Sequence, residues 1–264
     1  MKITSFTALS TVASLLVSLP ALAEEGHLHS DIEISVEGNQ MVVDNDELID
    51  LETGRIIIEG EFGGEGVPFE TDDPGFLVEA GAFNPGDSLW YTAHNSLTVW
   101  DEATESFVAP ANLEQLRIVG DFNDPVIVTS TGIFANNSVT VDFADATGEV
   151  HRHVEYILET ETGADPAPGA YRLEMSVFGF TPNFSVYHMS ENFYIVFNNG
   201  LEEEVYEELV EHLTGVAHDD DHEGEDDHDH DDEDDHDDED DHDHDDEDDH
   251  DDEDDHDDED HSEE

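Results

Sequence analysis

Cysteine is absent from all 264 residues of the chain. This absence excludes disulfide bonds as a source of stability, and it also excludes every metal site built on thiolate ligands. A folded domain in this chain must therefore be stabilised by buried apolar surface and by hydrogen bonds. Any transition-metal site must use histidine nitrogen and carboxylate oxygen.

Positive charge is also scarce, with five Lys and Arg residues against 74 Asp and Glu residues and a formal net charge of −69. The positive residues beyond position 23 are Arg55, Arg117, Arg152 and Arg172. Nucleic acid is excluded as a partner, because so few positive side chains cannot neutralise phosphates. An anionic membrane surface is excluded for the same reason.

Long apolar runs are confined to the N-terminus. Residues 1–23 have the features of a secretory signal peptide: Lys2 provides the positive start, residues 6–19 are apolar, and Ala21-Leu22-Ala23 is a small-x-small cleavage site. Because no second apolar stretch follows, we expect no membrane insertion after cleavage. The mature protein is predicted to be periplasmic or secreted.

Residues 24–217 predict one β-rich domain. Short alternating or β-branched segments of strand length are separated by turns rich in Gly, Pro and Asn. For example, residues 32–36 alternate and are followed, across Gly38-Asn39, by residues 40–43, as in a hairpin. About a dozen short strands joined in this way are typical of a mainly β fold. We expect an antiparallel β-sandwich of the jelly-roll or Greek-key type.

One helix is predicted near residues 201–214, where it would close the domain. Leu201, Val205, Leu209 and Leu213 recur at a spacing of four and form an apolar stripe. Gly215 follows at a position where glycine commonly ends a helix.

Residues 218–264 consist almost entirely of Asp, Glu and His. They contain an internal repeat, because residues 227–240 recur letter for letter as residues 241–254. With no apolar side chains to offset the entropy of ordering, and with like charges along its length, this acidic tail is predicted to be disordered.

The histidines of the acidic tail predict metal binding. Imidazole suits zinc, nickel and copper, neighbouring carboxylates can complete the coordination, and the negative field concentrates cations. Calcium is a rival, but it prefers oxygen ligands, and so many imidazoles argue against it. The alternative is a solvating tail whose histidines are incidental. The predicted tail ligands are His218, His222, His228, His230, His236, His242, His244, His250, His256 and His261.

A second metal site is predicted within the domain. On a strand over residues 150–158, His151, His153 and Glu155 would share one face, because alternate residues of a strand point the same way. His188, together with His29 or Asp31, would supply the remaining ligands. His27 and His29 can alternatively form a separate chelating arm, and the strand face can simply be a polar outer surface.

Four segments resemble a family of exported bacterial β-rich proteins that are repressed by the zinc-uptake regulator. They are His27-x-His29-Ser30-Asp31-Ile32, Asp73-Pro74-Gly75-Phe76, His151-x-His153 and residues 193–200. The resemblance spans most of residues 27–200. It implies synthesis under zinc starvation, a zinc-binding role tied to zinc acquisition, and a component of a zinc uptake system as partner. It also favours zinc over nickel or copper.

These features predict a non-enzymatic periplasmic zinc buffer or chaperone. One alternative is a carbohydrate- or surface-binding β-sandwich with a solubilising tail, in which Trp90, Tyr91 and Trp100 would stack on sugars. Another is a cupin-like metal-dependent enzyme, since His151-x-His153 and His188 faintly resemble cupin motifs. The glutamate spacing of those motifs does not match, and no nucleophile elbow, P-loop or HExxH motif is present.

Overall fold

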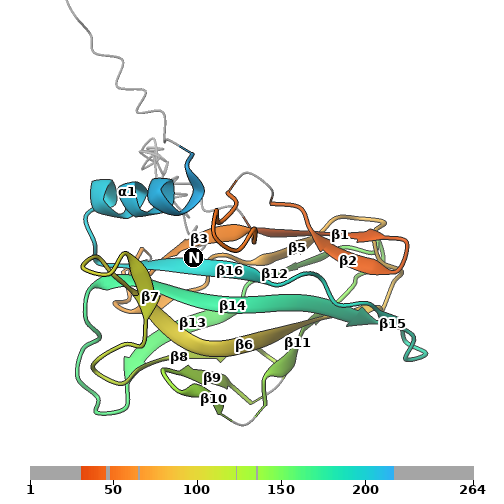
Figure 1. Ribbon diagram of the computed structural model, residues 1–264. Helices are drawn as coiled ribbons and strands as arrows, with labels where there is room; N and C mark the ends of the chain where they lie inside the picture. The colour runs from red at the N-terminus through yellow and green to blue at the C-terminus, as the bar shows by residue number, and fades with distance from the viewer. Residues whose placement is uncertain (1–30, 46–47, 65, 123, 135, 217–264) are drawn as a thin grey trace, which may run out of the picture. The chain divides into compact units, whose positions relative to one another are not determined.

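The computed structural model describes residues 31–45, 48–64, 66–122, 124–134 and 136–216. These residues form a mainly β domain, as the sequence predicts (Figure 1). Its strands are β1 (Ile32–Glu37), β2 (Gln40–Val43), β3 (Ile57–Glu61), β4 (Glu70–Thr71), β5 (Phe76–Val78), β6 (Ser88–Asp101), β7 (Ser106–Val108), β8 (Glu114–Val119), β9 (Val126–Thr129), β10 (Gly132–Phe134), β11 (Ser138–Phe143), β12 (Val150–Arg152), β13 (Glu155–Thr160), β14 (Gly169–Phe180), β15 (Val186–Tyr187) and β16 (Phe193–Asn199).

The strands form three sheets that share one hydrophobic core. A seven-stranded sheet has the order β11-β6-β14-β16-β3, with β7 and β15 pairing at its sides. The two smaller sheets have the orders β12-β5-β1-β2 and β10-β9-β8-β13-β4. Buried residues from all three sheets belong to a single core cluster, so the seven-stranded sheet packs by one face against the two smaller ones. This arrangement is a β-sandwich.

Two strand pairs depart from the antiparallel expectation. β1 pairs with β5 in parallel, and β16 pairs with β3 in parallel. Parallel neighbours cannot be joined by a tight hairpin, and other strands intervene along the chain between the members of each pair. Local alternation predicts that a strand exists but carries no information on such long-range pairing.

The helix α1 (Glu203–Thr214) packs on the outer face of the seven-stranded sheet, where Tyr206, Leu209 and Val210 form a second apolar cluster with residues of β3, β14 and β16. Gly215 ends the helix in a left-handed conformation with φ 70°, as predicted. The predicted apolar stripe is wrong in part, because Val205 is 51 % exposed. The buried face instead follows spacings of three and four, which match the 3.6-residue turn.

The predicted signal peptide, the histidines at positions 27 and 29, and the acidic tail lie outside the described residues. Within the described part of the chain, no helix has the length and apolar character needed to cross a membrane.

The observed buried face of α1 predicts that two alanine substitutions will differ in their effect on stability. Leu209→Ala should lower the free energy of unfolding by about 2–4 kcal/mol, because Leu209 is buried against the sheet. Val205→Ala on the exposed face should change it by less than about 0.5 kcal/mol. Urea denaturation of the full chain measures both, and equal losses would contradict this packing.

Candidate metal centre

The candidate metal centre lies at one edge of the four-stranded sheet. In the strand register, Ile32 at the start of β1 and Arg152 at the end of β12 both lie opposite Phe76, the first residue of β5. The residues just outside these strands therefore reach the same edge. They are Asp31 before β1 and His153 after β12, and both lie beside the turn that precedes β5.

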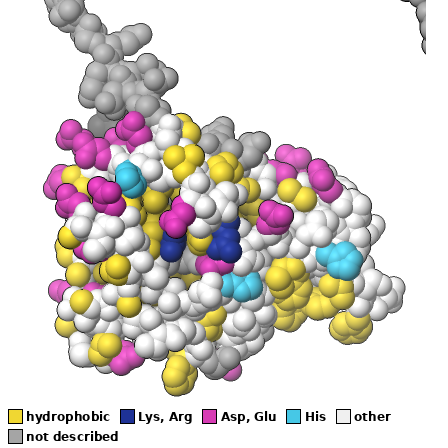
Figure 2. All heavy atoms as spheres, in the orientation of Figure 1, with side chains coloured by type: hydrophobic (Ala, Val, Ile, Leu, Met, Phe, Trp, Pro, Cys, Tyr) yellow, Lys and Arg dark blue, Asp and Glu magenta, His cyan; other side chains and the backbone are white. Residues whose placement is uncertain are grey.

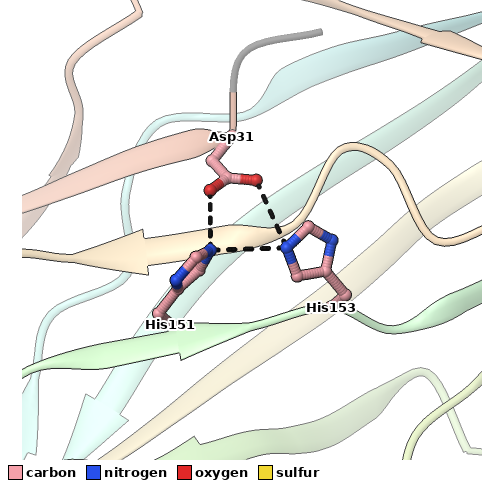
Figure 3. Close-up of side chains that lie close together, drawn as sticks. All are labelled: Asp31, His151 and His153. Carbon is pink, nitrogen blue, oxygen red and sulfur yellow. Dashed lines mark hydrogen bonds and ion pairs between the residues drawn. The ribbon is translucent and has the colours of Figure 1, made fainter. Parts of the chain in front are cut away.

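Three side chains point toward one another at this edge (Figure 3). The Nε2 atom of His151 lies 3.0 Å from Asp31 Oδ2 and 3.3 Å from His153 Nε2. The Nε2 atom of His153 lies 3.8 Å from Asp31 Oδ1. In a tetrahedral zinc site with bonds near 2.0–2.1 Å, neighbouring ligand atoms are about 3.3 Å apart. The three donor atoms are thus spaced as ligands of one small cation.

The second nitrogen of His153 fixes its tautomer. Nδ1 lies 3.0 Å from the backbone carbonyl oxygen of Asp72 and 3.2 Å from Asp73 Oδ1. A carbonyl oxygen can only accept a hydrogen bond, so Nδ1 carries the proton and donates it. The lone pair is then on Nε2, which faces Asp31 and His151. Metal-binding histidines commonly donate their other ring N–H to a carboxylate or carbonyl in this way, which orients the ring.

The short distance between the two Nε2 atoms requires a hydrogen atom or a cation between these groups, because two nitrogen lone pairs beside a carboxylate would repel one another. A neutral His151 ring with its hydrogen on Nε2 can donate it to Asp31 or to His153 Nε2, and a bound cation could take the place of that hydrogen. Both histidines remain accessible to solvent, since the side chain of His151 is 51 % exposed and that of His153 is 35 % exposed. A cation from solvent can therefore reach these nitrogens.

Gly75 allows the close packing at this edge. A Cβ atom at this position would lie 2.8 Å from Asp31 Oδ1 and 2.9 Å from the His153 ring. The backbone N–H of Gly75 also donates a hydrogen bond of 3.1 Å to Asp31 Oδ1. A side chain at this position would therefore displace Asp31 and His153.

Glu155 and His188 lie away from the metal centre. The prediction of a single strand over residues 150–158 is wrong, because this segment forms β12 and β13, which belong to different sheets. Glu155 is the first residue of β13 and pairs with Val119 of β8. His188 is bonded through its backbone to Asn39 and Met41, at the hairpin end of β1, whereas Asp31 precedes the other end. Within the described residues, two groups have the composition and spacing of a metal site. They are Asp31 with His151 and His153, and Asp72 with Asp73 and His153.

The aromatic residues predicted for sugar stacking do not form one platform. Tyr91 is 1 % exposed and stacks on Phe76 within the core. Trp90 packs against Phe178 and Phe180, whereas Trp100 lies ten residues further along β6 beside Phe107.

Comparison with known proteins finds no match of the chain to any protein-family model and none to a curated protein. The geometry of the metal centre is therefore the main basis for a functional proposal.

The packing around Gly75 can be tested with a matched pair of glycine substitutions. Gly75→Ala should push Asp31 and His153 apart and weaken zinc binding at this centre by at least about tenfold. Gly64→Ala is the control, because a Cβ atom at Gly64 has nothing within 4 Å. Calorimetric titration with Zn²⁺ of a chain lacking the acidic tail measures both, and unchanged affinity in Gly75→Ala would contradict the tight-packing argument.

Proposed function

We propose that this protein is an exported zinc-binding protein that holds one ion at the metal centre and further, labile ions in the acidic tail. The observation that carries the proposal is the convergence of Asp31, His151 and His153 at the ligand spacing of a tetrahedral site. The protein acts as a buffer or chaperone that captures zinc and releases it, and it performs no catalysis.

The ligand set favours zinc among divalent cations. Two imidazoles and one carboxylate are a common zinc combination, whereas calcium takes six to eight oxygen ligands. Nickel and copper also bind imidazole, but copper(II) and often nickel(II) prefer square-planar or tetragonal geometry. The resemblance to zinc-starvation proteins supports the same choice.

Three ligands from the domain leave a fourth coordination position. His29 precedes Asp31 by two residues in the sequence and is our candidate for the fourth ligand. An open fourth position would let the ion exchange, which suits a protein that passes zinc to a component of an uptake system in the periplasm.

The acidic tail has a different role from the metal centre. Its ten histidines are spaced among carboxylates along the sequence, so we expect each ion to bind with modest affinity and the total capacity to be high. The full chain should therefore contain two classes of zinc site, a single tighter one in the domain and several weaker ones in the tail.

Deletion of residues 218–264 tests this division. The truncated chain should bind a single Zn²⁺ with the affinity of the tighter class, whereas the full chain should bind several ions. The two apolar clusters of the described residues lie within residues 32–213, so truncation should leave thermal unfolding of the metal-free domain nearly unchanged. Calorimetry with Zn²⁺ measures stoichiometry, and an equal number of ions in both chains would rule out the tail as a metal store.

Substitution of one histidine tests the metal centre itself. In the truncated chain, His151→Ala should weaken the tighter zinc site by at least about tenfold, because it removes one of three domain ligands. His188→Ala is the matched control, since His188 is also exposed but lies at the other end of β1. If both variants bind zinc as the parent does, the domain contains no site at this edge.

A further inference from the structure

Arg172 differs from the other arginines of the domain. Each of the other three forms an ion pair, as in the 2.7 Å contact between Arg55 and Glu174 or the 3.4 Å contact between Arg117 and Glu159. Among the described residues, the side chain of Arg172 forms neither an ion pair nor a hydrogen bond. A guanidinium group has five N–H donors, so this group has a large unused capacity for hydrogen bonds.

Two aromatic rings hold the Arg172 guanidinium in place. Its central carbon lies 4.0 Å from the centre of the Phe107 ring and 4.5 Å from the centre of the Tyr194 ring. Burial lowers the pKa of Arg172, because removal from water disfavours the charged form. Stacking uses the flat faces of a guanidinium and leaves the N–H groups at its edge for a planar acceptor such as a carboxylate.

Arg172 lines a cavity of about 550 Å³ on the outer side of the seven-stranded sheet. The cavity size lies within the range of small-molecule sites. Trp100 and Phe107 provide aromatic walls, and His212 and Leu213 of the last turn of α1 form another side. Figure 2 shows this face of the molecule, where the dark-blue Lys and Arg side chains surface between magenta acidic and yellow hydrophobic ones.

Acidic groups line the same cavity. Asp50 is 3 % exposed, and its Oδ1 atom accepts hydrogen bonds from the backbone N–H groups of Glu52 and Thr53 and from the Thr53 hydroxyl. Glu52 and Glu105 are exposed lining residues. A purely anionic ligand would be repelled by these three carboxylates, and a purely cationic one would leave the N–H groups of Arg172 without an acceptor. A ligand that carries both charges matches the cavity.

We propose that this cavity binds a small zwitterion with an apolar body, of the α-amino-acid class. The ligand carboxylate accepts hydrogen bonds from Arg172, its ammonium group faces Asp50 and Glu52, and its apolar body packs on Trp100 and Phe107. A net-neutral ligand also avoids the long-range repulsion that this acidic domain exerts on anions. The site is separate from the metal centre and does not depend on the zinc-binding role.

Three related probes test the proposal on the full chain in the presence of a chelator, which excludes binding through metal. Phenylalanine carries both charges, phenylalaninamide lacks the carboxylate, and 3-phenylpropionate lacks the ammonium group. In a Trp90→Phe background, Trp100 is the only tryptophan and reports on the cavity by fluorescence. Phenylalanine should give a saturable change, and each analogue should bind at least about tenfold more weakly.

Two arginine substitutions, one inside the cavity and one outside it, test whether Arg172 binds the ligand. Arg172→Gln should weaken phenylalanine binding by at least about tenfold, whereas Arg117→Gln, which removes a cation from another sheet, should leave it unchanged. The proposal is wrong if phenylalanine gives no saturable response in the millimolar range, if all three probes bind alike, or if Arg172→Gln binds like the parent. If Arg172→Gln fails to fold, the relative affinities of the three probes for the chain that retains Arg172 still test the proposal.

Discussion

Negative charge that four arginines cannot neutralise is the constraint on which the rest of this domain depends. Exposed ion pairs contribute little to stability, and here too few cations exist for them to offset the mutual repulsion of the carboxylates. The fold must therefore be stabilised by its shared apolar core and by the second cluster beneath α1. The same excess of carboxylates is consistent with the proposed binding of divalent cations, because each bound ion would also relieve repulsion.

The metal centre shows how strand register converts this charge into a defined site. Parallel pairing of β1 with β5 and antiparallel pairing of β5 with β12 bring three chain segments to one edge. A carboxylate in one segment and imidazoles in another then meet across a glycine that leaves room for both. Asp31 accepts a hydrogen bond from the Gly75 N–H group, and His153 donates one to the Asp72 carbonyl oxygen, so folding orients both side chains before any cation binds.

The sequence alone predicted part of this site, and the limits have physical causes. The spacing of His151 and His153 singles them out, and Asp31 is one of two residues, with His29, that the sequence offers beside His188 for the remaining ligands. Glu155 was grouped with them because alternation assumes one continuous strand, but the chain changes sheets between residues 152 and 155. Asp73, which supports the His153 ring, lies 80 residues away in sequence, and only the pairing of distant strands brings it close. Such pairing has no local signature.

The fold was more predictable than the site, for a related reason. Turn residues and alternating segments determine where strands begin and end, so the mainly β character follows from local pattern. In α1, the stripe was misplaced because side chains four positions apart drift by about 40° per step around a helix of 3.6 residues per turn. Tyr206, Leu209 and Val210 stay on the side that faces the sheet, whereas Val205 has turned away from it.

The exposure of the candidate metal centre bears on the kind of zinc site that we propose. A structural zinc site is closed by four protein ligands, and its ion is released only when the fold opens. At this edge, His151 belongs to β12, Asp31 and His153 flank strands, and the more exposed imidazole is half accessible to solvent. If a cation binds here as proposed, a ligand from another molecule could reach it directly and replace one ligand at a time. Such stepwise exchange would need no unfolding of the sandwich, so transfer of the ion would be compatible with a stable domain.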